Sequence, residues 1–403
     1  MNLRPLILAA ATFCAACSHT QPAAIADVTP ATAPQPLRLA TYNTSLYTDR
    51  AGGLIEDLKA GSAQARAIAA VLQHVRPDIV LLNEFDYDSG EQAAELFQRQ
   101  YLEVGQDGSE PLHYAYRYLA PVNTGVPSGM DLDNDGQVGG EGRAHGNDAF
   151  GYGLHPGQYG MLLLSRHPID AAAVRSFQLL KWHTMPGARR PMDPATGKPF
   201  WPDAVWQNVR LSSKSHWDVP VDTPAGRLHV LASHPTPPAF NGPEKRNVSR
   251  NADELRLWDE YLKGESHSDW LCDDQGRCGG LPADARFVIV GDLNNDPLNG
   301  NGINRAIAGL VNHPRVLRMP APRSEGVLEV AERYAAKGLK LQGDMSHGTG
   351  DFGPRVGTLR LDYVLPSAGF TLRDSGVFWP DSGSPLAPLA QASDHHLVWV
   401  DVE

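Results

Sequence analysis

A strand–helix–strand unit near the start of the chain constrains the fold more than any other feature of the sequence. Residues 37–42 alternate apolar and polar side chains, which is typical of a half-buried strand, and this strand ends at Asn43. The spacing of apolar residues between Ser62 and Pro77 predicts a helix. A short buried strand over residues 79–82 then delivers Glu84 at its C-terminal end. Such a unit places two parallel strands side by side, with polar residues gathered at one edge of the sheet.

The rest of the sequence continues to alternate strands and helices. Further strands are predicted, each with a polar residue at or beside one end, at Met161 to Leu164, Leu228 to Ala232, Phe287 to Val290, Leu359 to Leu365 and Leu397 to Val402. Helical patterns lie between them, around Glu254 to Leu262 and around Val327 to Ala336. The sequence shows no internal repeat, so we expect one domain over residues 37–403 with long insertions at about 105–157 and 170–215.

Residues 1–17 have the pattern of an export signal. A positive residue precedes an apolar stretch from Leu6 to Ala16, which is too short to cross a bilayer and ends in small residues. The residues leading to Cys17 resemble the lipobox of bacterial lipoproteins, which predicts lipidation of that thiol. The alternative is cleavage by the ordinary signal peptidase and release as a soluble protein. Residues 18–36, rich in Ala, Pro, Thr and Gln, predict a disordered linker.

The remaining cysteines and the charge balance narrow the class of protein. Cys272 and Cys278 flank a short polar loop, which favours a disulfide over a metal pair in an oxidising compartment. The formal net charge is −11, and no dense run of Lys and Arg forms the electrostatic track of a protein that binds long nucleic acids. A nuclease is not excluded, because a few local cations and a bound divalent ion can hold one phosphate.

Oxygen and imidazole groups recur at the predicted strand ends. Hydrolysis of a phosphate ester needs a divalent cation, an activated water in line with the leaving group, and a donor for the developing charge. Mg²⁺ prefers carboxylate and amide oxygens as ligands, and imidazoles transfer protons near neutral pH. The residues that supply these groups are Asn43, Glu84, Asp292, Asn294, Asp394, His234 and His395.

Seven short blocks of sequence surround these residues. They are Ala40-Thr-Tyr-Asn43, Pro77-Asp-Ile-Val-Leu-Leu-Asn-Glu84, Gln158-Tyr-Gly-Met-Leu-Leu-Leu-Ser-Arg-His-Pro168, Leu231-Ala-Ser-His234, Gly291-Asp-Leu-Asn-Asn-Asp-Pro297, Arg360-Leu-Asp-Tyr-Val-Leu365 and Ala392-Ser-Asp-His395. In this order they resemble the motifs of the endonuclease/exonuclease/phosphatase superfamily, which has the deoxyribonuclease-I-like fold. The chain looks like an exported bacterial member, and the resemblance covers it from about residue 37 to its end.

The resemblance implies a fold and a metal site. The fold is a four-layer α/β sandwich, in which two mixed β-sheets pack face to face and are flanked by helices. Glu84, with Asn43 nearby, would hold Mg²⁺ or Mn²⁺, and Asp394 would join directly or through water. Asp292 would orient or deprotonate the attacking water, while Asn294 would hydrogen-bond the phosphate oxygens.

The resemblance also implies roles for the imidazoles. His395 would stabilise the transition state or protonate the leaving oxygen, with Asp362 fixing its tautomer and orientation. His234 would be the second such imidazole, with Gln158 as its partner.

Two further segments carry candidate binding groups. Lys214 and His216, just before the strand that ends at His234, would contact the phosphate; the alternative is a solvent-facing strand start with Trp217 in the core. A second segment has the carboxylate spacing of a calcium loop, but it lacks the closing Glu of an EF-hand. We expect a Ca²⁺ ion that stabilises the insertion there, against the alternative of a solvated turn, with ligands from Asp131, Asp133 and Asp135.

The sequence thus predicts a metal-dependent hydrolase of phosphomono- or phosphodiesters that acts outside the cytoplasm. It would be periplasmic, anchored to the outer membrane as a lipoprotein, or secreted, without an obligate protein partner. Nuclease, sugar- or inositol-phosphate phosphatase and phospholipid head-group phosphodiesterase remain open, and the acidic balance favours a small substrate over nucleic acid. The alternative from another class is a non-catalytic, calcium-stabilised surface binding module on the same fold.

Overall fold

The computed structural model describes Met1 and residues 36–403. The predicted export signal, Cys17 and the linker up to residue 35 therefore lie outside the described residues. Within the part that is described, no helix is both long and apolar enough to cross a bilayer. The fold below is that of the unit Pro36–Glu403.

The first sheet grows from the predicted strand–helix–strand unit. β1 (Leu37–Leu46) and β2 (Ile79–Phe85) pair in parallel, with Leu39 opposite Ile79 and Asn43 opposite Asn83. Between them runs α2 (Ala63–Val75), where the Ser62 hydroxyl accepts a hydrogen bond from the Ala65 N–H as the helix cap. Antiparallel strands extend the sheet to the order β12-β13-β1-β2-β4-β3, with β3 (Tyr116–Tyr118), β4 (Met161–Ser165), β12 (Leu372–Val377) and β13 (Val398–Val402).

The second sheet also combines parallel and antiparallel pairs. β7 and β8 run in parallel, and the other neighbours are antiparallel. The order is β11-β8-β7-β6-β5, with β5 (Arg175–Ser176), β6 (His216–Thr223), β7 (Gly226–Ser233), β8 (Arg286–Asp292) and β11 (Asp362–Pro366). A separate two-stranded ladder joins β9 (Gly350–Asp351) to β10 (Thr358–Leu359).

The two sheets pack face to face because each strand buries alternate residues on opposite faces. In β1 and β2, Leu39 and Leu81 join the core between the sheets, together with Val230 and Val290 of the second sheet. Tyr42 lies three residues after Leu39 on β1, so its side chain points to the opposite face of the sheet and packs against the helices. The predicted four-layer α/β sandwich is confirmed.

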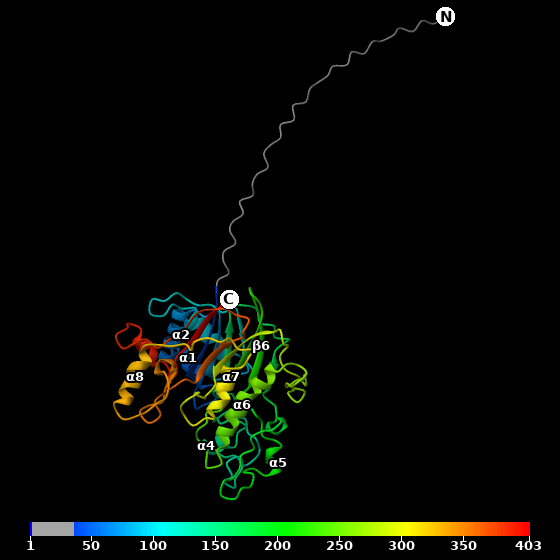
Figure 1. The fold of residues 1–403 in the computed structure, drawn as a ribbon. Helices are drawn as coiled ribbons and strands as arrows, with labels where there is room; N and C mark the ends of the chain where they lie inside the picture. Colours follow the sequence, from blue (N-terminus) through cyan, green and yellow to red (C-terminus); the bar gives the residue numbers. More distant parts are fainter. Residues whose placement is uncertain (2–35) are drawn as a thin grey trace. The chain divides into compact units, whose positions relative to one another are not determined.

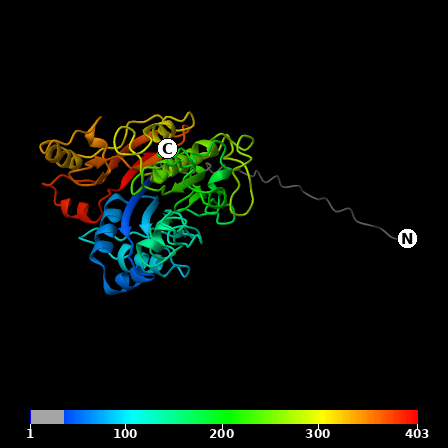
Figure 2. The ribbon, with the colours of Figure 1, turned by 90° about the horizontal axis from the view of Figure 1, so that it is seen from below.

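Helices cover both outer faces of the paired sheets. Figures 1 and 2 show α1 and α2 over one face and α6 and α7 over the other, with the strands between them. The insertions, coloured cyan to green, carry α4 and α5 toward one end of the unit in Figure 1. The helices besides α2 are α1 (Gly53–Ala60), α3 (Gln92–Phe97), α4 (Arg143–Asn147), α5 (Asp203–Trp206), α6 (Arg246–Leu262), α7 (Asn304–Val311) and α8 (Gly326–Ala335). Short turns of other helix types lie at Gln98–Leu102, Trp182–Thr184, Met345–His347 and Ala387–Gln391.

α6 begins at Arg246, well before the predicted start at Glu254. Its first half is polar, so it shows no apolar periodicity, yet the structure buries several of these polar residues. Asn251 donates to the carbonyl oxygens of Thr236 and Leu293, and Glu254 accepts from backbone N–H groups. The buried face of α6 therefore supplies hydrogen-bond partners for backbone groups in the loops that follow β7 and β8. A search for apolar spacing does not detect a helix face of this kind.

The strand predicted over Leu359 to Leu365 is wrong as one element. Arg360 and Leu361 interrupt it, because their backbone groups bond to side chains and loops instead of a neighbouring strand. The Arg360 N–H donates to Asp296 at 2.8 Å, and the Leu361 carbonyl accepts from the Leu293 N–H at 2.7 Å. Only the part from Asp362 pairs with β8.

Candidate active site

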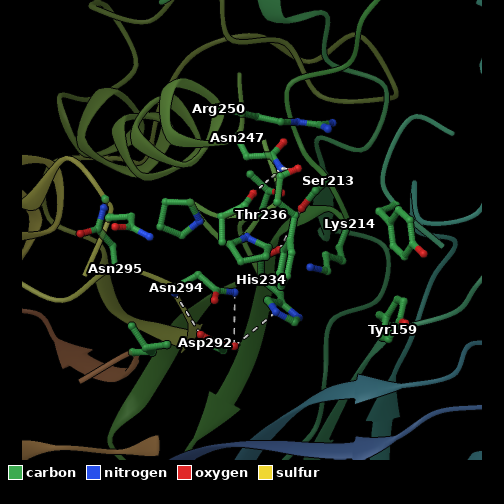
Figure 3. Close-up of a pocket in the computed structure, with 18 of the residues that line it drawn as sticks. Tyr159, Ser213, Lys214, His234, Thr236, Asn247, Arg250, Asp292, Asn294 and Asn295 are labelled. Atoms are coloured by element: carbon green, nitrogen blue, oxygen red, sulfur yellow. Dashed lines mark hydrogen bonds and ion pairs between the residues drawn. The ribbon is translucent and has the colours of Figure 1, made fainter. Parts of the chain in front are cut away.

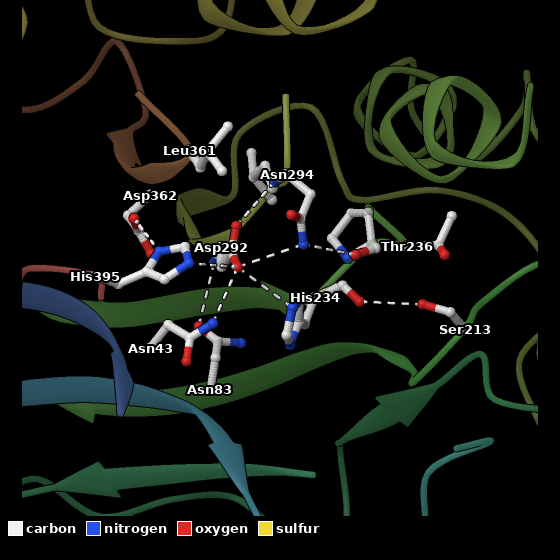
Figure 4. Close-up of polar contacts among 12 residues, drawn as sticks. Asn43, Asn83, Ser213, His234, Thr236, Asp292, Asn294, Leu361, Asp362 and His395 are labelled. Carbon is white, nitrogen blue, oxygen red and sulfur yellow. Dashed lines mark hydrogen bonds and ion pairs between the residues drawn. The ribbon is translucent and has the colours of Figure 1, made fainter. Parts of the chain in front are cut away.

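The ends of strands from both sheets meet at one edge of the sandwich. Asn43 ends the regular register of β1 with β2, and Glu84 lies next to the end of β2. In the second sheet Asp292 ends β8 and is paired with Asp362, the first residue of β11. His234 follows β7 directly. The parallel pairs β1–β2 and β7–β8, together with the start of β11, thus deliver these side chains to the same edge. Figure 4 shows Asn43, His234, Asp292 and Asp362 close together there.

Asp292 is the centre of this arrangement. Its carboxylate accepts hydrogen bonds from the Asn43 side chain at 3.1 Å and from the Asn294 backbone N–H at 3.0 Å. The His234 Nε2 lies 3.3 Å and the His395 Nε2 3.7 Å from its Oδ2 atom. Burial alone would raise the pKa of Asp292, but the neighbouring imidazoles and amides outweigh burial and lower it. The carboxylate is therefore ionised and held between two imidazoles.

The imidazole of His395 is fixed from its other side. Its Nδ1 lies 2.8 Å from the Asp362 carboxylate, which in turn accepts from the Thr349 hydroxyl at 2.7 Å. Burial alone would lower the pKa of His395, but the carboxylates of Asp362 and Asp292 outweigh it and raise that pKa well above its ordinary value of 6.5. Asp362 therefore lies in contact with His395, where it can orient the imidazole as the resemblance implies.

His234 has a different environment. Its side chain is buried, and its Nδ1 has no hydrogen-bond partner among the described residues. Burial lowers the pKa of His234 to about 4, and the nearby Lys214 ammonium acts in the same direction. At neutral pH the two imidazoles on Asp292 therefore differ in charge: His395 is cationic and His234 is neutral.

Replacing Asp362 with asparagine is expected to lower the pKa of His395 in the metal-free protein, because the largest stabilising charge is removed. In the wild type the raised pKa contributes stability that is fully present below pH 6.5 and lost as the pH rises through the folded pKa. In the variant that loss occurs at lower pH. Histidine NMR titration measures this; Asp218→Asn, which removes a different His–carboxylate pair, is the control. An unchanged titration of His395 in Asp362→Asn contradicts the account.

The groups proposed for the metal face the same pocket. Glu84 and Asp394 both line it, Glu84 half-buried and Asp394 exposed. Neither carboxylate has a cationic side chain within ion-pair distance among the described residues, and burial raises the pKa of Glu84. Asn43, the third group proposed for the metal, donates to Asp292. Oxygen atoms without a cation partner at a pocket wall fit a hard divalent ion.

Strained backbone gathers around this pocket. Non-glycine residues with positive φ are uncommon, and five of them line the pocket. Glu84 has a φ of 56° and Asn294 a φ of 52°, so the backbone turns sharply one residue before the end of β2 and two residues after the end of β8. The other three are Ser45, Tyr159 and Phe240. Strain of this kind persists where the surrounding structure fixes a functional geometry.

These residues lie on one wall of a cavity of about 820 Å³. Figure 3 shows His234, Asp292 and Lys214 at one end and Asn247 at the other. Tyr152 and Phe240 also line the cavity, and Phe240 is 82% exposed. The volume lies within the range of small-molecule sites.

Lys214, a candidate from the sequence, lines this cavity and is 6% exposed. His216 does not reach it. Its Nδ1 bonds to the Ser212 hydroxyl at 2.6 Å and its Nε2 to the Glu254 carbonyl at 3.0 Å. Both ring nitrogens are therefore used within the fold, so the expectation that His216 binds phosphate is not met. Trp217 is fully buried in the core, as the alternative interpretation of this segment predicted.

Gln158 is also placed away from its expected partner. Its side chain donates to the Thr48 carbonyl at 2.8 Å and accepts from the Leu154 N–H at 2.7 Å. These bonds hold the loop before β4 against the loop after β1. The expectation that Gln158 orients His234 is therefore not met, because its amide groups are already satisfied elsewhere.

Asn83 is a site residue that the sequence reasoning missed. It is fully buried on β2, yet its Oδ1 accepts from the Asp292 backbone N–H at 3.2 Å and from the Thr41 hydroxyl at 3.2 Å. It therefore ties the end of β8 to the opposite sheet. Its position directly before Glu84 was visible in the sequence, but a bond across 209 residues was not.

Only two of the three carboxylates predicted to bind calcium lie close together. Carboxylate oxygens of Asp131, Asp133 and Asp148 lie within 4.8 Å of one another, whereas Asp135 instead accepts from the Gln137 N–H. Asp148 replaces Asp135 because it follows α4 and folds back onto the loop, where it accepts from the Leu132 N–H. Ca²⁺ binding here stays a prediction.

If Ca²⁺ binds this loop, millimolar Ca²⁺ is expected to raise the melting temperature by a few degrees through ligand linkage. Asp131→Asn should abolish that rise, whereas Asp135→Asn should leave most of it. Differential scanning calorimetry measures both, and an equal Ca²⁺ response in all three proteins contradicts the loop assignment.

The α/β sandwich, with carboxylate, amide and imidazole groups converging at its strand ends, defines a class of hydrolases that act on phosphate esters. The chain belongs to the Endonuclease/Exonuclease/phosphatase family, whose model matches residues 40–395. The family that the sequence motifs resemble is thereby confirmed.

Several solved structures are similar to this chain at low identity. An endonuclease/exonuclease/phosphatase from Beutenbergia cavernae is 19% identical with a TM-score of 0.49, covering 92% of this chain and 72% of its own. Sphingomyelinase C from Streptomyces griseocarneus is 18% identical with a TM-score of 0.44, covering 91% and 99%. A beta toxin variant from Staphylococcus aureus with bound magnesium ions is 12% identical with a TM-score of 0.42, covering 91% and 99%. No curated protein sequence matches the chain.

Proposed function

We propose that this protein is a metal-dependent hydrolase of phosphomono- or phosphodiesters that acts outside the cytoplasm, by in-line attack of an activated water. One observation carries the proposal: Asp292 lies between His234 and His395 at 3.3 Å and 3.7 Å, on the wall of the pocket that Glu84 also lines. Family membership supports the hydrolase class.

The metal would be Mg²⁺ or Mn²⁺, held by Glu84 with Asn43 and Asp394 nearby. When bound, it neutralises non-bridging phosphate oxygens and so lowers the barrier to attack. Its oxygen ligands would come from two neighbouring strands and from the loop before β13, and this donor set suits a hard ion better than a soft one.

The chain's own residues supply positioning and proton transfer. Asp292 is ionised, so it can accept a hydrogen bond from the attacking water and hold that water in line. The Asn294 side-chain amide donates to the same carboxylate at 3.3 Å and to the Pro235 carbonyl at 3.1 Å, so it would exchange one of these bonds to donate to a phosphate oxygen. His395 is protonated, so it can stabilise charge on the phosphoryl group or donate a proton to the leaving oxygen.

A small substrate is favoured over nucleic acid. The cavity of about 820 Å³ matches a small molecule, and the net charge of −11 opposes a long polyanion. Action outside the cytoplasm is supported by the export pattern of residues 1–17 and by the disulfide between Cys272 and Cys278, the pairing that the sequence favours.

The test is a screen of the purified protein with Mg²⁺, Mn²⁺ and Ca²⁺ against plasmid DNA, bis-nitrophenyl phosphate, nitrophenyl phosphate and sphingomyelin. We expect turnover of at least one small ester with Mg²⁺ or Mn²⁺, and none after chelation. Silence on all four substrates with every ion would overturn the proposal in favour of a non-catalytic binding module.

A further inference from the structure

The charged side chains that line the cavity come from two different groups of segments. The carboxylates that the described residues contribute to its wall all come from a strand end or a loop beside one, and these are Glu84, Asp292, Asp296 and Asp394. The guanidinium groups come instead from α4 and from the first half of α6, and these are Arg143, Arg246 and Arg250. We call these three arginines the arginine end of the cavity. Figure 3 shows Arg250 beside Asn247, at the end opposite Asp292.

The two aromatic residues Phe200 and Trp201 join α4 to the start of α6. The Leu132 carbonyl accepts from the Trp201 indole N–H at 3.0 Å, and the Leu132 N–H donates at 2.7 Å to Asp148, the residue that follows α4. The Arg246 guanidinium lies 5.6 Å from the ring centre of Phe200. These contacts bring α4 and the start of α6 to the same end of the cavity.

Two of the three arginines have no carboxylate partner in the part of the chain that the structure describes. Arg250 holds backbone carbonyls such as that of Leu211, at 2.8 Å, but its Nη1 forms no hydrogen bond with a described residue. Arg143 is exposed and likewise forms none. Arg246 pairs with Glu244 at 2.5 Å, which offsets one of the three charges. Because guanidinium groups stay protonated, a net positive charge remains at the arginine end and is available to an anion.

The start of α6 adds to this positive charge. The helix has 17 residues, and its N-cap residue is Lys245, whose side chain cannot accept from the first N–H groups. The N–H groups of Arg246 and Asn247 have no acceptor among the described residues. Free N–H groups and the helix dipole favour an anion at the start of a long helix. Both residues line the cavity, so the helix start and the guanidinium groups act on the same space.

We propose that the arginine end is a second anion site, and that the substrate is a small ester with two phosphoryl groups. The inference rests on the proposed function and deepens it by naming the substrate class. One phosphoryl group reacts at the Asp292 centre, while the other binds Arg143, Arg246 and Arg250 and is not cleaved. Guanidinium groups suit this role because their planar N–H groups can donate in pairs to phosphate oxygens.

The test is isothermal titration calorimetry of the full protein with Mg²⁺ and α,ω-alkane bisphosphonates of increasing length. Each is compared with the alkyl monophosphonate of the same length, and the C–P bonds of both probes resist hydrolysis. At the length that spans the cavity, wild type is expected to bind the bisphosphonate about tenfold or more tightly than the monophosphonate, since charge-assisted hydrogen bonds are added.

Arg143→Met and Arg250→Met should each weaken bisphosphonate binding by about threefold to tenfold and leave monophosphonate binding unchanged. If Arg250→Met does not fold, Arg250→Lys and Arg143→Met provide the comparison. Arg66→Met is the matched control, because Arg66 is an exposed arginine of α2 that does not line the cavity. It should bind both probes as wild type does.

Equal affinity of wild type for the two probes at every length would overturn the inference, as would an equal loss of both affinities in folded Arg143→Met. A short oligonucleotide that binds more tightly than every bisphosphonate, with the same dependence on Arg143, would also overturn it, because the second phosphate would then belong to a nucleic acid. The ester screen is a separate readout. A bisphosphonate preference without turnover of any ester would support the second anion site while refuting the hydrolase, and turnover without the preference would do the reverse.

Discussion

Replacing Asp292 with alanine or asparagine should lower kcat by about 10²- to 10⁴-fold, the range associated with a positioned acid–base or electrostatic group. The carboxylate is the one group bonded at once to Asn43, Asn294 and His234, so its loss removes both the acceptor for the attacking water and the anion between the imidazoles. The asparagine variant keeps the shape of the side chain. It therefore separates the loss of charge from the loss of packing.

Steady-state kinetics on whichever nitrophenyl ester the protein hydrolyses measure this effect. Asp218→Asn is the matched control, because Asp218 is also a buried carboxylate of the second sheet and also pairs with an imidazole, that of His229, at 2.8 Å. It does not line the pocket. The control is expected to lose stability and keep its kcat. Full activity in Asp292→Asn would remove Asp292 from the centre of the mechanism.

The second large effect is expected from Glu84→Gln. Because Glu84 is the half-buried carboxylate of the proposed metal site, the substitution should weaken binding of Mn²⁺ or Mg²⁺ by at least about 10- to 100-fold, the loss seen when even outer groups of a metal site are removed. Activity should fall in the same proportion at low metal concentration and recover in part at high concentration. Asp394→Asn should have a smaller effect, since that carboxylate is exposed.

Calorimetric metal titration and the metal dependence of kcat measure this prediction together. Glu56→Gln, which neutralises an exposed glutamate on α1 paired with Arg50, is the control and should bind metal as wild type does. Metal affinity that is unchanged in Glu84→Gln would place the ion elsewhere.

Individual strands and helices were predictable because apolar periodicity records them directly, whereas the four layers were implied by the resemblance to the family. β1, α2 and β2 lie where the alternation and the spacing between Ser62 and Pro77 predicted. The start of α6 was predicted too late in the chain, and β10 and β11 were predicted as one strand. Both errors have the same cause, because buried polar groups in these segments are satisfied by particular long-range hydrogen bonds, such as that from Arg360 to Asp296, which no local pattern records.

The site was predictable as a set of residue types and only partly as a set of contacts. Strand-end positions correctly brought together Asn43, Asp292, Asp362 and the two imidazoles. His216 and Gln158 are polar residues near the site whose side chains the fold uses for its own hydrogen bonds. Asn83 is the opposite case, a residue that was not predicted for the site but belongs to it. Its role depends on which residue of the opposite sheet faces it, and sequence spacing within one strand does not contain that information.

The most direct test of hydrolysis at this centre is turnover in water enriched in ¹⁸O, with Mg²⁺ and the preferred nitrophenyl ester. In-line attack by a water held on Asp292 predicts one ¹⁸O atom from solvent in the phosphate-containing product and none in the nitrophenol. Label in the nitrophenol, or no product with any ion, would contradict the account.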